Sequence, residues 1–205
     1  MTQIKNLIFD LGVVLVNLDR EGCIRAFKEL GIDQIEKLTS LAGHQGIFGD
    51  YERGVLSTSE FYDRIRQLAG RDIPDHKIRG AWLQMVSDLP SYKLDKLLEL
   101  KSRYRIFLLS NTNELHWDWC AETMFRYQDK SADDFFEKRW LSNEIHLLKP
   151  SREIFEYILT DGNLNPEETF FLDDAEPNCR MAETLGIRTY QPSVEEDWTF
   201  LFNQK

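Results

Sequence analysis

The stretch that decides the fold is IKNLIFDLGVV, residues 4–14, close to the start of the chain. Its first half, Ile4–Phe9, is mostly apolar and lacks the strict alternation of a half-exposed strand, which is typical of a strand covered on both faces. Asp10 interrupts the apolar run at the point where this strand should end. Ligands bind at the carboxyl ends of the strands in an open parallel sheet, so Asp10 lies where a reactive carboxylate is expected.

Four more short segments have the composition of strands, and segments with helical spacing lie between them. Apolar residues recur every three or four positions before the second strand, after Lys149-Pro150 and before Gly186. This glycine suits the end of a helix. The residues Asn165-Pro166-Glu167-Glu168 have the pattern of a helix start. Strands that alternate with helices predict an α/β fold with a doubly wound parallel five-stranded sheet. The four further strands are expected at Tyr104–Leu109, Phe135–Trp140, Thr169–Leu172 and Ile187–Tyr190.

Residues 17–88 break this alternation, because they contain helical patterns and no convincing strand. Ser57-Thr58-Ser59-Glu60 is a capping box, the signal of a helix that starts there. Trp82 and Met85 suit a last helix that ends near Leu89-Pro90. The other apolar positions with helical spacing are Ile24, Phe27, Leu30, Ile32, Ile35, Leu38, Phe61, Ile65 and Leu68.

A helical block after the first strand is the pattern of a lid over the carboxyl end of that strand. The length of 205 residues is sufficient for one substantial core and a small lid. We therefore expect an α/β core formed by residues 1–16 and 89–205, with an inserted α-helical cap of residues 17–88.

The composition is that of an ordinary globular protein, with 42% hydrophobic and 29% charged residues. A net charge of −10 disfavours nonspecific binding to nucleic acid, which needs a basic surface. The N-terminus lacks a signal-peptide layout, and no apolar run approaches the ~20 residues of a membrane span. Cys23, Cys120 and Cys179 form neither a metal-binding spacing nor a disulfide framework. We expect a cytoplasmic protein without nucleic-acid or membrane partners, and the sequence has no signal for its oligomeric state.

Chemically active residues follow the predicted strands where the strands end. Asp10 follows the first strand, Ser110-Asn111-Thr112-Asn113 follows the second, Lys149 precedes the helix after the third, and Asp173-Asp174 ends the fourth. Parallel strands bring all these residues to one edge of the sheet. A carboxylate, a hydroxyl-and-amide loop, a lysine and an acidic pair are together suited to phosphoryl transfer.

Each group has a role in the hydrolysis of a phosphate ester. Asp10 can attack phosphorus and form an aspartyl-phosphate, which divides one difficult reaction into two easier steps. Mg²⁺ prefers oxygen ligands and would hold the phosphate next to this carboxylate despite their like charge. Ser110 and the N–H groups after it can donate hydrogen bonds to the phosphate, and Lys149 supplies positive charge in the transition state.

Four motifs in this order resemble those of the haloacid dehalogenase superfamily, specifically its phosphatase-like members with an inserted helical cap. They are FDLG at Phe9–Gly12, LSNTN at Leu109–Asn113, LLKP with Lys149, and FLDD at Phe171–Asp174. The resemblance covers essentially the whole chain. Sugar-phosphate phosphatases with an FDLG-type first motif are the nearest likeness, which implies a small phosphorylated metabolite as substrate and Mg²⁺ as cofactor.

The resemblance also implies roles for individual residues. Asp10 would be the nucleophile and a metal ligand, and the carbonyl of Gly12 a second ligand. Asp174 would bind Mg²⁺ directly, while Asp173 would act through water or orient Lys149. The phosphate-binding residues would be Ser110, Asn111 and Lys149.

Gly12 departs from the superfamily pattern, which commonly has a second aspartate here as general acid and base. Such a group is typically worth ~10²–10⁴ in rate. Its absence predicts that esters with good leaving groups, such as aryl phosphates, react faster than primary alkyl phosphates. Asp19 and His116 are candidate substitutes. A surface role for Asp19, and packing between core and cap for His116, Trp117 and Trp119, are the alternatives.

Two other functions stay open from the sequence. A metal-free 2-haloacid dehalogenase would use the same aspartate on a carbon–halogen bond, but the Asp173-Asp174 pair argues against it. A noncatalytic phosphate-binding protein is the second alternative, and Gly12 is its best support. In the expected cap, Glu52 and Arg53 either reach the substrate or lie on a solvated face. His44, His76 and His146 have no spacing that indicates a metal site.

Overall fold

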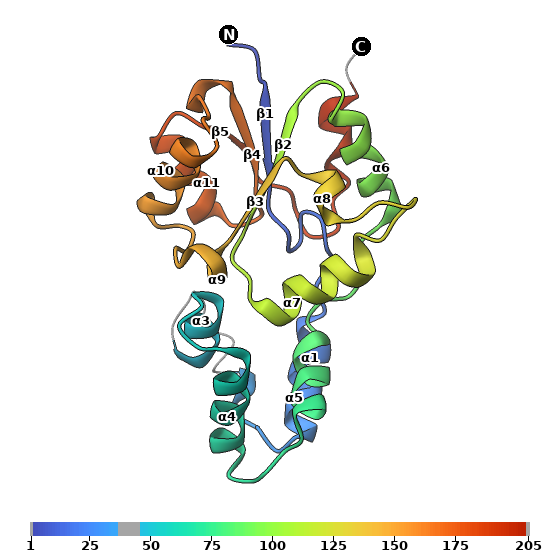
Figure 1. Cartoon of the computed structure of the whole chain (residues 1–205), viewed down its shortest axis with the longest axis vertical. Coiled ribbons are helices and arrows are strands. Elements are labelled where there is room, and N and C mark those ends of the chain that lie inside the picture. Colours follow the sequence, from blue (N-terminus) through green and yellow to red (C-terminus); the bar gives the residue numbers. More distant parts are fainter. Residues whose placement is uncertain (1, 37–45, 204–205) are drawn as a thin grey trace.

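The computed structural model describes residues 2–36 and 46–203. Its centre is a five-stranded, all-parallel sheet in the order β3-β2-β1-β4-β5 (Figure 1). This confirms the predicted doubly wound α/β fold. None of the helices in these two ranges has the length and apolar character needed to cross a membrane. The strands are β1 (Asn6–Phe9), β2 (Arg105–Ser110), β3 (Lys138–Leu141), β4 (Thr169–Leu172) and β5 (Arg188–Tyr190).

Strand β1 lies in the middle of the sheet, and its side chains are apolar on both faces. Leu7 and Phe9 pack on one side with α6 (Ser91–Leu100), and Ile8 packs on the other side with α10 (Arg152–Asp161). Successive side chains of a strand point to opposite faces, so a strand covered on both sides needs an unbroken apolar run. The helix α11 (Glu176–Thr184) covers the same face as α10, as Figure 1 shows.

The predicted strands agree with the structure within a few residues, except at β3. Phe135, expected to begin this strand, instead ends the short helix α8 (Ala132–Phe135). Ser131 and Asp134 form a capping box that starts this helix, so local hydrogen bonds outweigh the β propensity of the aromatic residues. The predicted helix start at Asn165 produces only the single 3₁₀ turn η2 (Pro166–Glu168) before β4 begins.

Four further short helical elements belong to the core. They are α7 (Glu114–Trp119), the π-helical turn η1 (Cys120–Met124), α9 (Ser142–Ile145) and the 3₁₀ helix η3 (Trp198–Phe202). Gly186 follows α11 with φ +87°, the left-handed conformation expected of a helix-ending glycine.

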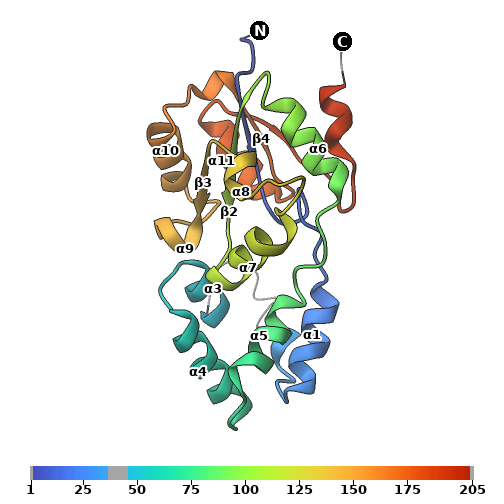
Figure 2. The same cartoon turned by 45° about the vertical axis from the view of Figure 1, so that its right-hand side comes forward.

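Helices α1 (Arg20–Glu29), α3 (Gly46–Glu52), α4 (Thr58–Ala69) and α5 (Asp75–Leu83) form a separate helical layer below the sheet (Figures 1 and 2). This layer has its own apolar cluster, which includes Phe27, Phe61 and Trp82. The Ser57 capping box is present at the start of α4, as predicted. The last helix ends at Leu83, earlier than predicted, because the following residues pair with the segment before α1. Leu38 and His44 lie outside the described residues.

The chain enters and leaves the helical layer side by side. The N–H of Asn17 donates to the carbonyl of Asp88 at 2.7 Å, and the N–H of Ser87 donates to the carbonyl of Asn17 at 2.9 Å. The N–H of Asp19 likewise donates to the carbonyl of Met85 at 2.9 Å. Because these segments meet, a short linker can replace everything between them. The division into a core of residues 1–16 and 89–205 and a cap of residues 17–88 stays a prediction that this geometry makes testable.

Joining residue 16 to residue 89 through a short Gly-Ser linker should leave a core that unfolds cooperatively, since every strand of the described sheet lies outside the cap. Leu115 packs into the apolar cluster of the cap, so the variant should also carry Leu115→Ser. Circular dichroism during heating measures the transition. A non-cooperative melt would show that the helical layer is part of a single folding unit.

Candidate active site

The carboxyl ends of the strands face the helical layer in Figure 1, and the predicted site residues meet there. Asp10 follows β1, Ser110 ends β2, and Asp173 and Asp174 follow β4. Lys149 comes from the loop between α9 and α10. The expected convergence at one edge is therefore observed.

Lys149 is the centre of this group, and its side chain is 1% exposed. Its Nζ lies 2.6 Å from Asp173 Oδ2 and 2.9 Å from Asp10 Oδ1, and it donates to the carbonyl of Leu109 at 3.0 Å. Burial by itself would lower the pKa of Lys149, but the two carboxylates outweigh burial and raise this pKa above its ordinary value. The ammonium group is therefore charged throughout the neutral range and ties the two carboxylates together.

The two adjacent aspartates have different surroundings. Asp173 is fully buried and accepts hydrogen bonds from the N–H of Ala175 at 2.9 Å, from Asn178 Nδ2 at 2.8 Å and 3.0 Å, and from Lys149. Asp174 is half-buried, and burial together with the neighbouring Asp173 raises the pKa of its carboxyl group. Asp173 is therefore fully engaged as an orienting group, while Asp174 is the better placed to bind a cation.

Asn178 is a site residue that the sequence did not single out. It lies in the first turns of α11 and supports both oxygens of Asp173. The one available signal was its spacing, since an amide five residues after Asp173 is carried back towards it when a helix starts in between.

Only one carboxylate oxygen of Asp10, Oδ1, makes the hydrogen bonds that hold this side chain. Its Oδ1 accepts from the N–H of Leu11 at 2.7 Å and from Lys149. Burial raises the pKa of Asp10 to about 7; Lys149 opposes this increase, and the charges of Asp173 and Asp174 add to it. An uncompensated cluster of carboxylates is costly, and a cation relieves the repulsion.

The residues present fit a hard divalent cation. Asp10, Asp173 and Asp174 can each offer an oxygen such that all three atoms lie within 4.8 Å of one another. The carbonyl oxygen of Gly12 accepts one hydrogen bond, from the N–H of Val14 at 2.6 Å, and a carbonyl has a second lone pair for a metal. Such an all-oxygen donor set is the kind that Mg²⁺ prefers.

The side chain of Asn111 is engaged with the lysine loop. Its Nδ2 donates to the carbonyl of Lys149 at 2.9 Å, and its Oδ1 accepts from the N–H of Lys149 at 2.9 Å. The side chain thus holds the main chain of the lysine loop against the end of β2. A phosphate contact by Asn111 would accordingly come from its main chain.

Asp19 and His116, the two candidates for a substitute acid, are both engaged in structural contacts. Neither is a free group at the carboxyl edge of the sheet, where Asp10 would react (the reacting edge). His116 stacks on Trp82 with ring centroids 4.5 Å apart. Its Nε2 donates to the carbonyl of Trp82 at 3.0 Å and its Nδ1 accepts from the amide of Asn113 at 3.2 Å, while burial lowers the pKa of the imidazole to about 4. Asp19 caps α1 by accepting from the N–H of Gly22 at 2.7 Å. Both side chains are structural.

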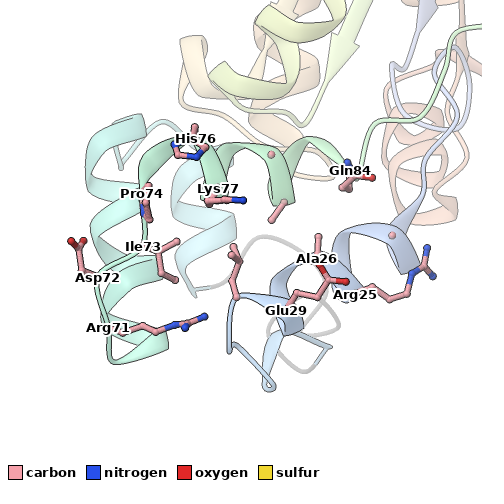
Figure 3. Close-up of a pocket in the computed structure, with 14 residues that line it drawn as sticks. Arg25, Ala26, Glu29, Arg71, Asp72, Ile73, Pro74, His76, Lys77 and Gln84 are labelled. Atoms are coloured by element: carbon pink, nitrogen blue, oxygen red, sulfur yellow. The ribbon is translucent and has the colours of Figure 1, made fainter.

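A cavity of about 180 Å³ lies between the reacting edge and the helical layer. The core contributes residues from both strand-end loops, including Gly12 and Ser110, and the helical layer contributes Glu52, Trp82 and Met85. A larger hollow of about 770 Å³ lies between α1 and α5, away from the carboxylates (Figure 3). Charges of both signs, such as Arg25 and Glu29, line it, and none of the predicted site residues does. The small cavity is therefore the candidate substrate site.

Comparisons with known proteins agree with this geometry. The chain is 35% identical over 195 residues to D-ribitol-5-phosphate phosphatase of Bacteroides thetaiotaomicron, and the match covers 95% of both chains. A haloacid dehalogenase family enzyme of the same organism, solved with magnesium and inorganic phosphate, superimposes with a TM-score of 0.94 at 46% identity and covers 98% of this chain and 100% of that one. A predicted hydrolase of this type from Porphyromonas gingivalis has a TM-score of 0.91 at 35% identity, with both chains fully covered.

More distant structures share only the fold. An L-2-haloacid dehalogenase superimposes with a TM-score of 0.62 at 13% identity, over 93% of this chain and 86% of that one. No protein-family model matches the chain. The close relatives, the order of the strand-end motifs and the cluster around Lys149 together show that this chain belongs to the haloacid dehalogenase family.

Proposed function

We propose that this chain is a Mg²⁺-dependent phosphatase that hydrolyses the monophosphate ester of a small sugar alcohol or sugar through an aspartyl-phosphate on Asp10. The observation that carries this proposal is the buried Lys149, which joins Asp10 to Asp173 beside the half-buried Asp174. The activity of the relative from Bacteroides thetaiotaomicron, and the magnesium and phosphate bound by a close structural neighbour, support it.

The first step is attack by Asp10 on phosphorus, with cleavage of the bond between phosphorus and the ester oxygen. Lys149 and the N–H of Leu11 hold one carboxylate oxygen, which orients the other for attack. Ser110, buried at the end of β2, would donate to the phosphate. In the second step, water cleaves the aspartyl-phosphate, so that phosphate is released and Asp10 is restored.

The cation would be held by Asp10, the carbonyl of Gly12 and Asp174, with Asp173 acting through Lys149. When bound, Mg²⁺ neutralises the like charges of the carboxylates and the phosphate. A metal-free dehalogenase would not need Asp174 as a cation ligand, so the acidic cluster favours the phosphatase.

The size of the cavity limits the substrate. About 180 Å³ is well below the ~300–1,000 Å³ that drug-sized ligands occupy. A compound with a few carbons, such as a five-carbon sugar alcohol phosphate, fits this limit. The direct assay measures the release of phosphate from D-ribitol 5-phosphate and from an aryl phosphate. Each ester is tested with Mg²⁺ and with a chelator. If neither ester is hydrolysed, the phosphate-binding alternative is favoured.

We also propose that the protein works in the reducing cytoplasm. The three cysteines are buried and unpaired, which suits a compartment where thiols stay reduced.

The substitution Asp10→Asn should abolish turnover while the fold stays cooperative, because an amide of the same size cannot attack phosphorus. Phosphate release and thermal unfolding are the two measurements. Glu29→Gln, an exposed substitution in α1, is the matched control and should behave as wild type. More than a tenth of wild-type activity in Asp10→Asn would remove this residue from the role of nucleophile.

The two adjacent aspartates should respond differently to replacement. Asp174→Ala should raise the Mg²⁺ concentration needed for half-maximal activity with little loss of stability. Asp173→Ala should lower the free energy of unfolding by about 3–5 kcal/mol, since Lys149 then keeps a buried charge with one partner fewer. Denaturant titration and Mg²⁺ titration of activity separate the two effects, and the opposite ranking would exchange the assigned roles.

Binding of Mg²⁺ should depend on pH near neutrality. A raised pKa of about 7 for Asp10 means that its carboxyl group is protonated below this pH and must lose a proton to bind the cation. The dissociation constant should therefore increase by about tenfold per pH unit below 7 and become constant above it. Isothermal titration calorimetry in two buffers should detect about one released proton at pH 6, whereas a constant affinity between pH 5.5 and 8 would contradict this mechanism.

A further inference from the structure

The proposed reaction leaves one proton transfer without a donor in the core. The ester oxygen of a primary alkyl phosphate, such as that of the substrate named for the relative, departs as a strongly basic alkoxide unless it is protonated. Gly12 stands where the family commonly has an aspartate. A Cβ atom at Gly12 would lie 3.3 Å from Leu18 Cδ1, so an apolar side chain occupies the adjacent space.

The titratable side chains that line the 180 Å³ cavity are Glu52, His116 and Cys120. Both ring nitrogens of His116 are engaged in hydrogen bonds, as described above. Cys120 is 1% exposed, and burial raises the pKa of its thiol to about 12. Glu52 is left, and its carboxyl group is the same kind of group as the aspartate that Gly12 replaces.

We propose that Glu52, supplied by the cap at the end of α3, is the general acid and base of the reaction in place of the carboxylate missing at Gly12. This inference rests on the proposed phosphatase function. Glu52 and Gly12 line the same cavity from opposite sides, the cap side and the core side. The leaving group of a substrate bound at Asp10 would occupy the space between them.

The main chain of Glu52 is fastened to the core. The hydroxyl of the buried Ser142 donates to the carbonyl of Glu52, with an Oγ–O distance of 2.6 Å. The same Oγ accepts from the N–H of Thr112 at 2.9 Å. Because Thr112 is two residues beyond Ser110, a single hydroxyl joins the phosphate loop to the backbone of the proposed acid. Groups that transfer protons need this kind of fixed placement.

The next two residues strengthen this attachment. His146 Nδ1 donates to the carbonyl of Arg53 at 2.9 Å. Gly54 has φ +68°, and a Cβ atom there would overlap the carbonyl oxygen of Asn143. Glycine is thus required where the loop lies against α9, and this contact fixes the segment that follows Glu52 against the core.

The proton balance closes over the two steps. The Glu52 carboxyl gives its proton to the ester oxygen as the bond from phosphorus to that oxygen breaks and the bond to Asp10 forms. The resulting Glu52 carboxylate takes a proton from the water that attacks the aspartyl-phosphate. The bond between phosphorus and Asp10 then breaks, and Glu52 is protonated again.

The test is single-turnover kinetics of Glu52→Gln with an alkyl and an aryl phosphate. Formation of the phosphoenzyme from D-ribitol 5-phosphate should slow by about 10²–10⁴, whereas the burst of nitrophenol from p-nitrophenyl phosphate should keep its rate, since nitrophenolate leaves without a proton. Phosphoenzyme should then accumulate in the variant, because the second step lacks its base. Acid quenching measures it, and Glu29→Gln is the control in the same cap.

Ser142→Ala provides an independent variant, since it removes the donor to the Glu52 carbonyl and leaves the carboxyl in place. It should slow the alkyl reaction more than the aryl burst, with a smaller effect than Glu52→Gln. An alkyl reaction within threefold of wild type in Glu52→Gln, an equal loss with both substrates, or an increase in KM alone would overturn the inference. Failure of the wild type to hydrolyse either ester would instead overturn the proposed phosphatase.

Discussion

The interaction on which the site depends is the buried contact of Lys149 with Asp10 and Asp173. The lysine neutralises part of a carboxylate cluster that would otherwise repel, and it does so at the carboxyl edge of the central strands. Two amides support it: Asn111 holds the lysine main chain, and Asn178 holds Asp173. One positive charge among three carboxylates leaves an electronegative site, which suits a divalent cation. Burial is the main cause of the raised pKa of Asp10, and the charges of Asp173 and Asp174 add to it.

The second constraint is the contact between the helical layer and the core. Trp82 stacks on His116 and donates to Asn113, and Leu115 of α7 enters the apolar cluster of the cap. Packing of α7 against the cap closes the small cavity over the reacting edge. His116 therefore packs between core and cap, which was one of the two interpretations of the sequence, while Trp117 and Trp119 pack in the apolar cluster of the core.

Much of the fold could be predicted because a parallel sheet converts sequence order into spatial order. An unbroken apolar run indicates a strand covered on both faces, and the residues that follow such strands must share one edge. Asp10, Ser110 and the Asp173-Asp174 pair were placed by this rule alone. Predictions were wrong where local hydrogen bonds decided the structure, as at Phe135 in α8 and at the 3₁₀ turn after Asn165.

The sequence by itself thus determined the fold class, the family resemblance and the residues at the strand ends, since each depends on short-range pattern and chain order. Only the tertiary structure decided which groups complete the site. Asn111 meets Lys149 across 38 positions, and Ser142 meets Glu52 across 90. No local pattern encodes such contacts, because the first joins two strand-end loops of the core and the second joins the cap to α9.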